Sequence, residues 1–240
     1  MDAPLNAPAE QPGDSPAGGG LSPTPRTQLG RHRERALGDR EDLFAVLDAA
    51  LICHLGVHVD GHTLVVPTVF ATDPTGPDRG GTLYVHGSVA AASLRAALAH
   101  DVCVTCTHLD GLVLARSGFH HSMNYRSAIV IGRGRLVSDD VEKQRALDQV
   151  VDHVVPGRSK TLRAATRKEL SATTVIAVPL YEASVKMRAG DPVDDDEDVA
   201  SGTWAGVLPL SLRAGAVQSA ADAAEVAVPP DVVSRADALS

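Results

Sequence analysis

A histidine, a glycine and a serine stand together where the chain could bind an anion. His86-Gly87-Ser88 closes the strand-like run Thr82–His86 and opens an Ala-rich segment, Val89–His100, that we expect to be helical. The first turn of a helix has unpaired backbone N–H groups and a partial positive charge. Gly87 would let the backbone approach a phosphate closely, and Ser88 adds a hydroxyl donor. The alternative is that Ser88 only caps its helix.

A second polar group stands directly before an apolar run. Tyr125, Arg126 and Ser127 precede Ala128–Ile131, so we expect them at the mouth of a strand that enters the core. Tyr125 and Ser127 would share one face of that strand, and Arg126 would take the other. Arg126 could pair with a phosphate, and the alternative is a structural salt bridge.

The cysteines and three further histidines are only weak candidates for a metal or redox site. Cys103 and Cys106 spell C-x-x-C, but Asp101–His108 is β-branched and strand-like, and residues three apart in a strand point to opposite faces. A zinc site would need a second pair, which the sequence lacks, so we predict no metal or redox site there. Three further histidines are spread over an expected hairpin, a weak pattern for a metal site: His54, His58 and His62.

The elements that position these residues follow from periodicity and turn signals. The expected strands are Leu51–Val59, His62–Phe70, Thr82–His86, Val102–His108, Asn124–Val137, Thr173–Leu180 and Ala183–Arg188. The expected helices are Glu41–Ala49, Val89–His100 and one that Asp139 and Glu142 begin as a capping box and Pro156-Gly157 ends. Several strands are joined by short turns, which excludes a repeating βαβ order. The fold class is therefore mainly β, an antiparallel sheet or barrel with flanking helices.

Composition limits the class of protein and its partners. The chain has 240 residues, of which 44% are hydrophobic, enough for one ordinary domain with tails. A net charge of −8 argues against nucleic acid as a partner, and three cysteines fit a reducing compartment. The start does not resemble a signal peptide, and no run reaches the ~20 apolar residues of a membrane span, so we expect a cytoplasmic protein without a membrane partner.

The chain divides by composition into three parts. Residues 1–25 are rich in Pro, Gly and Ala, and we expect a disordered tail. Residues 26–212 form the folded domain, with a solvated acidic loop at about 191–198. Residues 213–240 read as a second tail that is loose or partly helical.

Taken in order, several short motifs resemble the flavin-nucleotide-binding, nitroimidazole-reductase-like branch of the pyridoxamine 5′-phosphate oxidase-like superfamily. The resemblance runs from about Arg26 to Leu210 and rests on Pro67-Thr-Val-Phe70, Gly81–Ser88, Asn124–Gly132, Glu182–Arg188 and Trp204–Pro209. It implies an FMN-binding split β-barrel with flavin sites at the interface of a homodimer.

The resemblance also implies the residues of the site. They are Pro67, Thr68 and Val69 along the isoalloxazine ring, His86, Gly87 and Ser88 near the ribityl phosphate, Tyr125, Arg126 and Ser127 as further hydrogen-bonding groups, and Lys186 and Trp204 near the site. Trp204 would reach the partner subunit, and His86 would be the catalytic residue that tunes flavin reactivity. One departure is that Val89–Ser93 lacks the cation that relatives place against the phosphate. The nearest cation, Arg95, is expected on a different helix face.

The leading functional hypothesis is an FMN-dependent oxidoreductase acting on a small molecule. Three alternatives stay open. The first is a flavin carrier or sensor without catalysis. In the second, the same barrel binds deazaflavin or haem, which the histidine content permits. The third is a barrel that has lost its cofactor and serves only as an interaction module.

Overall fold

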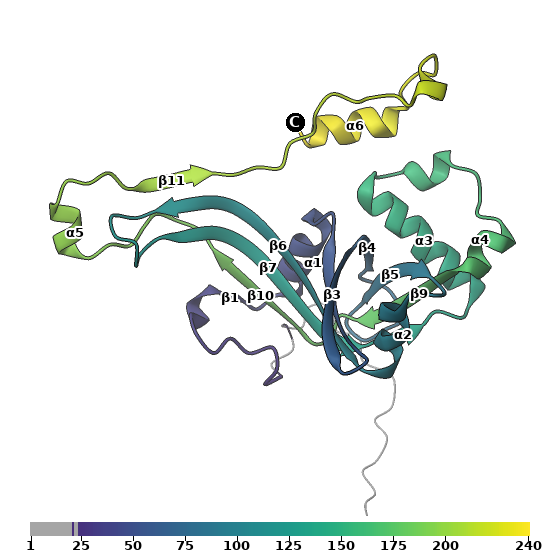
Figure 1. Cartoon of the computed structure of the whole chain (residues 1–240), viewed down its shortest axis with the longest axis horizontal. Coiled ribbons are helices and arrows are strands. Elements are labelled where there is room, and N and C mark those ends of the chain that lie inside the picture. The colour runs from purple at the N-terminus through teal and green to yellow at the C-terminus, as the bar shows by residue number, and fades with distance from the viewer. Residues whose placement is uncertain (1–20, 22–23) are drawn as a thin grey trace, which may run out of the picture.

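The computed structural model describes residue 21 and residues 24–240. The predicted disordered tail, residues 1–25, therefore lies almost entirely outside the described residues. The described chain forms two antiparallel sheets with helices packed around them (Figure 1).

The larger sheet has seven strands among the described residues. They are β1 (Ala36–Leu37), β2 (Cys53–Val59), β3 (His62–Thr68), β6 (Asp101–Leu114), β7 (Ser122–Arg133), β10 (Ala183–Arg188) and β11 (Gly206–Pro209). Their order is β1-β10-β7-β6-β2-β3, and β11 pairs with β6.

The smaller sheet has the order β4-β5-β9-β8. Its strands are β4 (Phe70–Asp73), β5 (Thr82–Ser88), β8 (Arg135–Leu136) and β9 (Thr173–Pro179). The prediction of a mainly β, antiparallel fold with flanking helices is confirmed. The hydrogen-bonded ladders of the described residues form two separate sheets, so closure into a split barrel stays a prediction.

The helices are α1 (Arg40–Ala49), α2 (Ala92–Ala99), α3 (Asp140–Val154), α4 (Arg167–Ala172), α5 (Asp196–Ala200) and α6 (Pro230–Ala238), with 3-10 turns at Arg33–Arg35, Arg158–Thr161 and Ala221–Ala223. They occupy different places: α1 packs into the core, α2, α3 and α4 lie against the sheets, α5 lies at the tip of the β6–β7 hairpin and α6 in the C-terminal segment (Figure 1). The predicted cap of α3 is present, since the Asp139 carboxylate accepts the Glu142 N–H at 2.8 Å. Within the described chain, none of these helices is both long and apolar enough to cross a membrane.

The core lies between the two sheets and α1. One face of α1 is buried, with Leu43, Val46 and Leu47 in the core cluster. Val85 of β5 and Val130 of β7 are completely buried in the same cluster. Burying a side chain of this size stabilises the fold by roughly 1.5–3 kcal/mol. The core therefore holds the two sheets, and the site residues on them, in one rigid frame.

Two predicted strands are each divided between the sheets. The run His62–Phe70 ends as β3 at Thr68, and Phe70 begins β4 because its side chain enters the core of the other sheet. Asn124–Val137 likewise breaks into β7 and β8 at Gly134. A Cβ on Gly134 would lie 2.6 Å from the carbonyl oxygen of Ala97, so only glycine allows this crossing.

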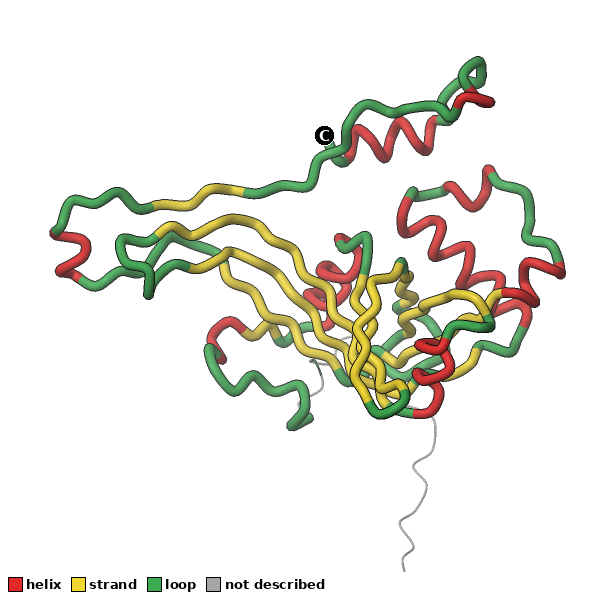
Figure 2. Tube along the Cα trace, viewed as in Figure 1, coloured by secondary structure: helices red, strands yellow, loops and turns green. Residues whose placement is uncertain are grey.

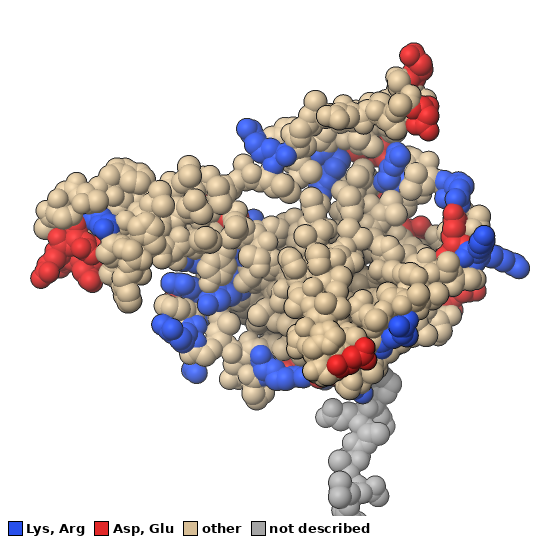
Figure 3. Space-filling model, in the orientation of Figure 1, with Lys and Arg blue, Asp and Glu red and all other residues tan. Residues whose placement is uncertain are grey.

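Three other boundaries differ from the prediction. β6 runs on to Leu114 past an irregularity at Leu109/Gly111, and with β7 it forms a long projecting arm (Figure 1). α2 begins at Ala92, because the Ala91 N–H donates to the Ser88 carbonyl and closes a turn first. The end of the acidic segment is helical as α5 and not a loop, and the acidic side chains gather at the tip of the arm (Figure 3).

The C-terminal segment runs from β11 as a long loop, interrupted by the turn Ala221–Ala223, and ends in α6 (Figure 2). The Ala214 N–H donates to the Leu239 carbonyl at 2.7 Å, which closes the segment on itself. Arg158 pairs with Asp231 of α6 at 3.4 Å. This part is partly helical, as predicted for residues 213–240.

Candidate functional site

The first candidate group lies where β3, β4 and β5 meet. Phe70 of β4 pairs with Val85 of β5, and continuing this antiparallel register by one residue places Val69 beside His86. Val69 and His86 therefore lie at one junction, whereas Pro67 and Thr68 belong to β3 and pair with His54 and Cys53 of β2 in the larger sheet. The role that the resemblance implies for these residues stays a prediction.

Gly87 and Ser88 each have a structural role at this junction. A Cβ on Gly87 would lie 3.0 Å from a methyl carbon of Leu94, so the glycine lets α2 pack closely on β5. The Ser88 hydroxyl accepts the Ala90 N–H at 3.2 Å, inside the turn before α2. Ser88 therefore does not cap α2: the helix begins after Ala91, without a side-chain cap from the described residues.

Arg95 was expected on a different helix face from the one that relatives turn to the phosphate. Its guanidinium nevertheless reaches the turn that follows Ser88, where it donates to the Ala90 carbonyl at 2.7 Å. Side chains on a helix lean towards its N-terminus, and arginine is long enough to span the first turn. A cation and the uncapped N-terminus of α2 therefore stand together, as a phosphate group would require.

The second candidate group lies on β7 and β10 of the larger sheet. Ser127 pairs with Lys186, and the Ser127 hydroxyl donates to the Lys186 carbonyl at 3.3 Å. Arg126 makes two hydrogen bonds to Asp110, at 3.0 and 2.8 Å, which is the structural salt bridge considered as its alternative. That pairing occupies the Arg126 charge.

Tyr125 and Trp204 complete the predicted set. Tyr125 pairs with Arg188 at the outer end of β10. Trp204 is 69% exposed and precedes β11, the strand that lines the arm. Strand pairing places all of these residues in the larger sheet or beside it, whereas His86–Ser88 belong to the smaller one. The single chain thus divides the predicted residues into two groups.

His86 itself faces a cavity of about 450 Å³ between β5 and the helical cover formed by α3, Arg158–Thr161 and α4. Leu147 and Val151 of α3 line it together with Leu162 and Leu170. The His86 ring makes no hydrogen bond to any described residue, and its Nδ1 atom is buried. Burial lowers the pKa of the imidazolium, so the ring is neutral near pH 7. A neutral imidazole with unpaired nitrogens can serve as a ligand to a metal.

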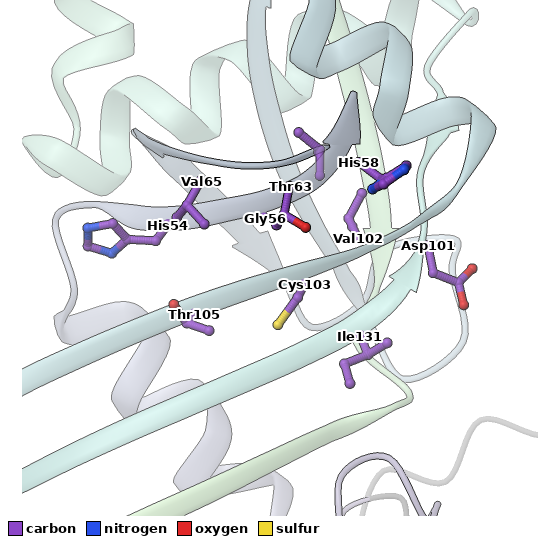
Figure 4. Close-up of a pocket in the computed structure, with 11 residues that line it drawn as sticks. His54, Gly56, His58, Thr63, Val65, Asp101, Val102, Cys103, Thr105 and Ile131 are labelled. Carbon is purple, nitrogen blue, oxygen red and sulfur yellow. The ribbon is translucent and has the colours of Figure 1, made fainter. Parts of the chain in front are cut away.

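A second hollow, of about 380 Å³, lies on the outer face of the larger sheet (Figure 4). His54 and His58 of β2, Val65 of β3 and Cys103 of β6 line it. Cys106 is instead buried in the core. The two cysteines thus point to opposite faces, as predicted.

One cluster that the sequence did not indicate lies at the tip of the arm. His120, Asp194 and Asp198 bring possible ligand atoms within 4.8 Å of one another. The Asp194 carboxylate is already paired with the Arg116 guanidinium at 2.8 Å. His120 lies more than 70 positions before the two aspartates, so no spacing rule could have found the cluster.

Comparison with known proteins identifies the family. Residues 39–187 match the family model of pyridoxamine 5′-phosphate oxidase. No curated protein matches the chain. Among solved structures, it is similar to the flavocytochrome Anf3 from Azotobacter vinelandii, with 36% identity over 89% of this chain and 98% of that chain and a TM-score of 0.81.

Two more solved structures are similar. The FAD and heme binding protein from Mycobacterium smegmatis is 38% identical over 84% of this chain and 97% of that chain, with a TM-score of 0.77. A candidate 5-nitroimidazole antibiotic resistance protein from Bacteroides thetaiotaomicron is 24% identical over 63% of this chain and 85% of that chain, with a TM-score of 0.51, and shares the fold. This chain belongs to the pyridoxamine 5′-phosphate oxidase family.

Proposed function

We propose that this protein is a redox protein that binds one flavin and one haem per subunit and works as a homodimer. One observation carries the proposal. The chain is 36% and 38% identical, over nearly the full length of each, to a flavocytochrome and to a FAD and heme binding protein. In this proposal the flavin is FAD, as in the second of these proteins, and not the FMN expected from the sequence.

The flavin would bind at the junction of β3, β4 and β5. The Pro67–Val69 backbone would line the ring system, and a phosphate would lie at the start of α2. The uncapped N-terminus of α2 and the Arg95 guanidinium support that end of the site. A flavin carries electrons in pairs and a haem singly, and the chain's own residues bind, orient and shield them.

The dimer is supported by the division of the predicted residues into two groups. A second copy could bring its β7–β10 group to the β4–β5 group of the first copy. The outer face of the larger sheet exposes apolar side chains that such a contact would cover, among them Val65 at 57% and Ile129 at 36%. Trp204, on the arm, is also free for such a contact.

The test is to purify the full chain from cells supplied with a haem precursor and to determine what it retains after gel filtration. We expect one flavin per subunit, identified as FAD by chromatography after acid release, and one haem by the pyridine haemochrome assay. Light scattering should give twice the 25.0 kDa chain mass. A protein that retains neither group, even after reconstitution, would overturn the proposal. If the protein retains flavin but no haem, the haem part of the proposal is wrong. If it is a monomer when saturated with flavin, the flavin site is not shared between two subunits.

A further inference from the structure

A helical cover lies over the outer face of the smaller sheet (Figure 1). It consists of α3, the turn Arg158–Thr161 and α4, and it returns the chain to β9. A hydrogen bond between Tyr84 of β5 and Glu142 joins the start of α3 to the sheet. Ala146 of α3 and Val175 of β9 pack together next to it in a small buried cluster. Beyond that cluster the cover leaves the sheet, and the cavity of about 450 Å³ opens in front of His86.

The cover contributes both apolar and polar side chains to the walls of this cavity. The large apolar ones are Leu147, Val151, Leu162 and Leu170, and the polar ones include Gln144 and Asp148 of α3. Leu162 is 46% exposed although it points to this space. Apolar side chains around an open space of this size are typical of the site of an apolar ligand, since burying them stabilises the complex by roughly 25 cal/mol per Å².

His86 lies at the bottom of the cavity. It is two residues beyond Tyr84 on β5, so both side chains point to the outer face of the sheet. A buried polar atom without a hydrogen-bond partner costs roughly 1–3 kcal/mol, and the Nδ1 atom of His86 is one. A ligand that binds a nitrogen of the His86 ring would remove this cost.

Both signs of charge lie at the rim of the cavity. The cover has five cations within eleven positions, Arg158, Lys160, Arg163, Arg167 and Lys168. Of these, Arg163 lines the cavity, and so do the carboxylates of Asp148 and Glu169. Arg163 pairs with Glu169 at 2.5 Å and remains 69% exposed. A solvated pair of this kind contributes little energy, so Arg163 can exchange Glu169 for a carboxylate of a ligand whose body is buried.

A flat apolar body, a metal that takes a histidine nitrogen and peripheral carboxylates are the three properties of haem. We propose that the His86 imidazole is the axial ligand of the haem iron in this cavity, with Arg163 at the propionates. The inference rests on the proposed haem binding and gives His86 a different role from the tuning of the flavin. Among the described side chains that line the cavity, His86 is the only histidine, cysteine or methionine. The second axial position is therefore open to an added ligand such as carbon monoxide.

The experiment is a haem titration of the full chain, followed by absorption and resonance Raman spectroscopy. The variants are His86→Gly, His86→Gly with added imidazole, and His32→Ala as the matched control. His32 is an exposed histidine that lines neither hollow. Circular dichroism of each variant confirms that it is folded.

After reduction with dithionite, we expect the unaltered protein and His32→Ala to bind one haem with a histidine–iron signature and to bind carbon monoxide. His86→Gly should bind at least about tenfold more weakly, the loss of one coordinating contact of roughly 1.4 kcal/mol or more, and without that signature. Imidazole should restore it. Equal affinity and an unchanged signature in His86→Gly would overturn the assignment while leaving haem binding intact. Absence of haem binding by the unaltered protein would overturn the proposed function, and this inference with it.

Discussion

The Tyr84 hydroxyl donates a hydrogen bond to the Glu142 carboxylate at 3.0 Å, and this bond ties β5 to α3 two residues before His86. The Arg135 guanidinium bridges the same carboxylate to Asp78, at 2.7 and 2.8 Å. The network holds the start of α3 against the smaller sheet. Further along the cover, the cavity in front of His86 separates the cover from the sheet. The position of the His86 cavity is therefore set by a polar anchor and not by apolar packing alone.

This anchor should make stability depend on pH. Arg135 holds the pKa of the Glu142 carboxyl below its usual value of 4.5. Because the folded pKa is the lower one, the stabilisation is complete above the unfolded value and is lost as pH falls through the folded value. Glu142→Gln should lower the free energy of unfolding at pH 7 by about 1 kcal/mol, since Arg135 is partly solvated. The difference from the unaltered protein should shrink below about pH 4.5.

Urea unfolding at pH 7 and at pH 3.5 measures this difference. Glu225→Gln, at an exposed position outside the helices, serves as the control and should have no effect at either pH. A Glu142→Gln deficit that is equally large at both pH values would show that the carboxylate charge does not contribute.

Arg95 should contribute to flavin affinity. Loss of a charged hydrogen bond of roughly 1.5–3 kcal/mol corresponds to a ten- to hundredfold weaker complex. We expect Arg95→Ala to raise the dissociation constant for FAD by that factor, measured by quenching of flavin fluorescence. Arg31→Ala removes an exposed cation elsewhere and should leave the constant unchanged. If riboflavin, which has no phosphate, is affected as strongly as FAD, Arg95 does not act on the phosphate.

Arg163 should act on the carboxylates of haem. Arg163→Ala is expected to weaken haem binding several-fold, because a solvated charge pair contributes up to about 1 kcal/mol. Haem dimethyl ester has no free carboxylates, so its affinity should not change in the same variant. Titration of both ligands, followed by absorption, separates the two cases. Equal losses for the ester and for haem would instead indicate a change in the shape of the cavity.

The cysteines should differ in reactivity. Burial raises the pKa of Cys53 and of Cys106 to about 12, so almost no thiolate is present at pH 8. A thiol reagent such as Ellman's should therefore react with neither residue in the folded protein and with all three cysteines in guanidinium. Cys103 is half-buried and is the one residue that should react in the folded state. A Cys103→Ser variant that still shows a rapidly reacting thiol would contradict this order.

Local signals in the sequence predict the well-defined elements. Strand β10 was predicted with its observed bounds, Ala183–Arg188, because alternation and flanking turn residues agree there. The Leu43, Val46 and Leu47 stripe of α1 follows from helical periodicity. Strand β11 was missed, because its four residues gain their structure only by pairing with β6.

The site depends on contacts that sequence spacing does not contain. Val69 and His86 become neighbours through the register of β4 on β5, which no local pattern specifies. The change of sheet between Thr68 and Phe70 is likewise a tertiary effect, since the whole run has strand character. The cavity in front of His86 exists only because the cover packs there, and the cover begins at Asp140, more than 50 residues further along the chain.

The measurement that tests the central claim most directly is an anaerobic reductive titration of the purified, haem-loaded protein with dithionite. A flavin takes up two electrons and a haem one, so we predict about three electron equivalents per subunit, with bleaching of the flavin bands and a shift of the Soret band. An uptake of about two equivalents without a Soret change would contradict the haem, and an uptake of about one without flavin bleaching would contradict the flavin.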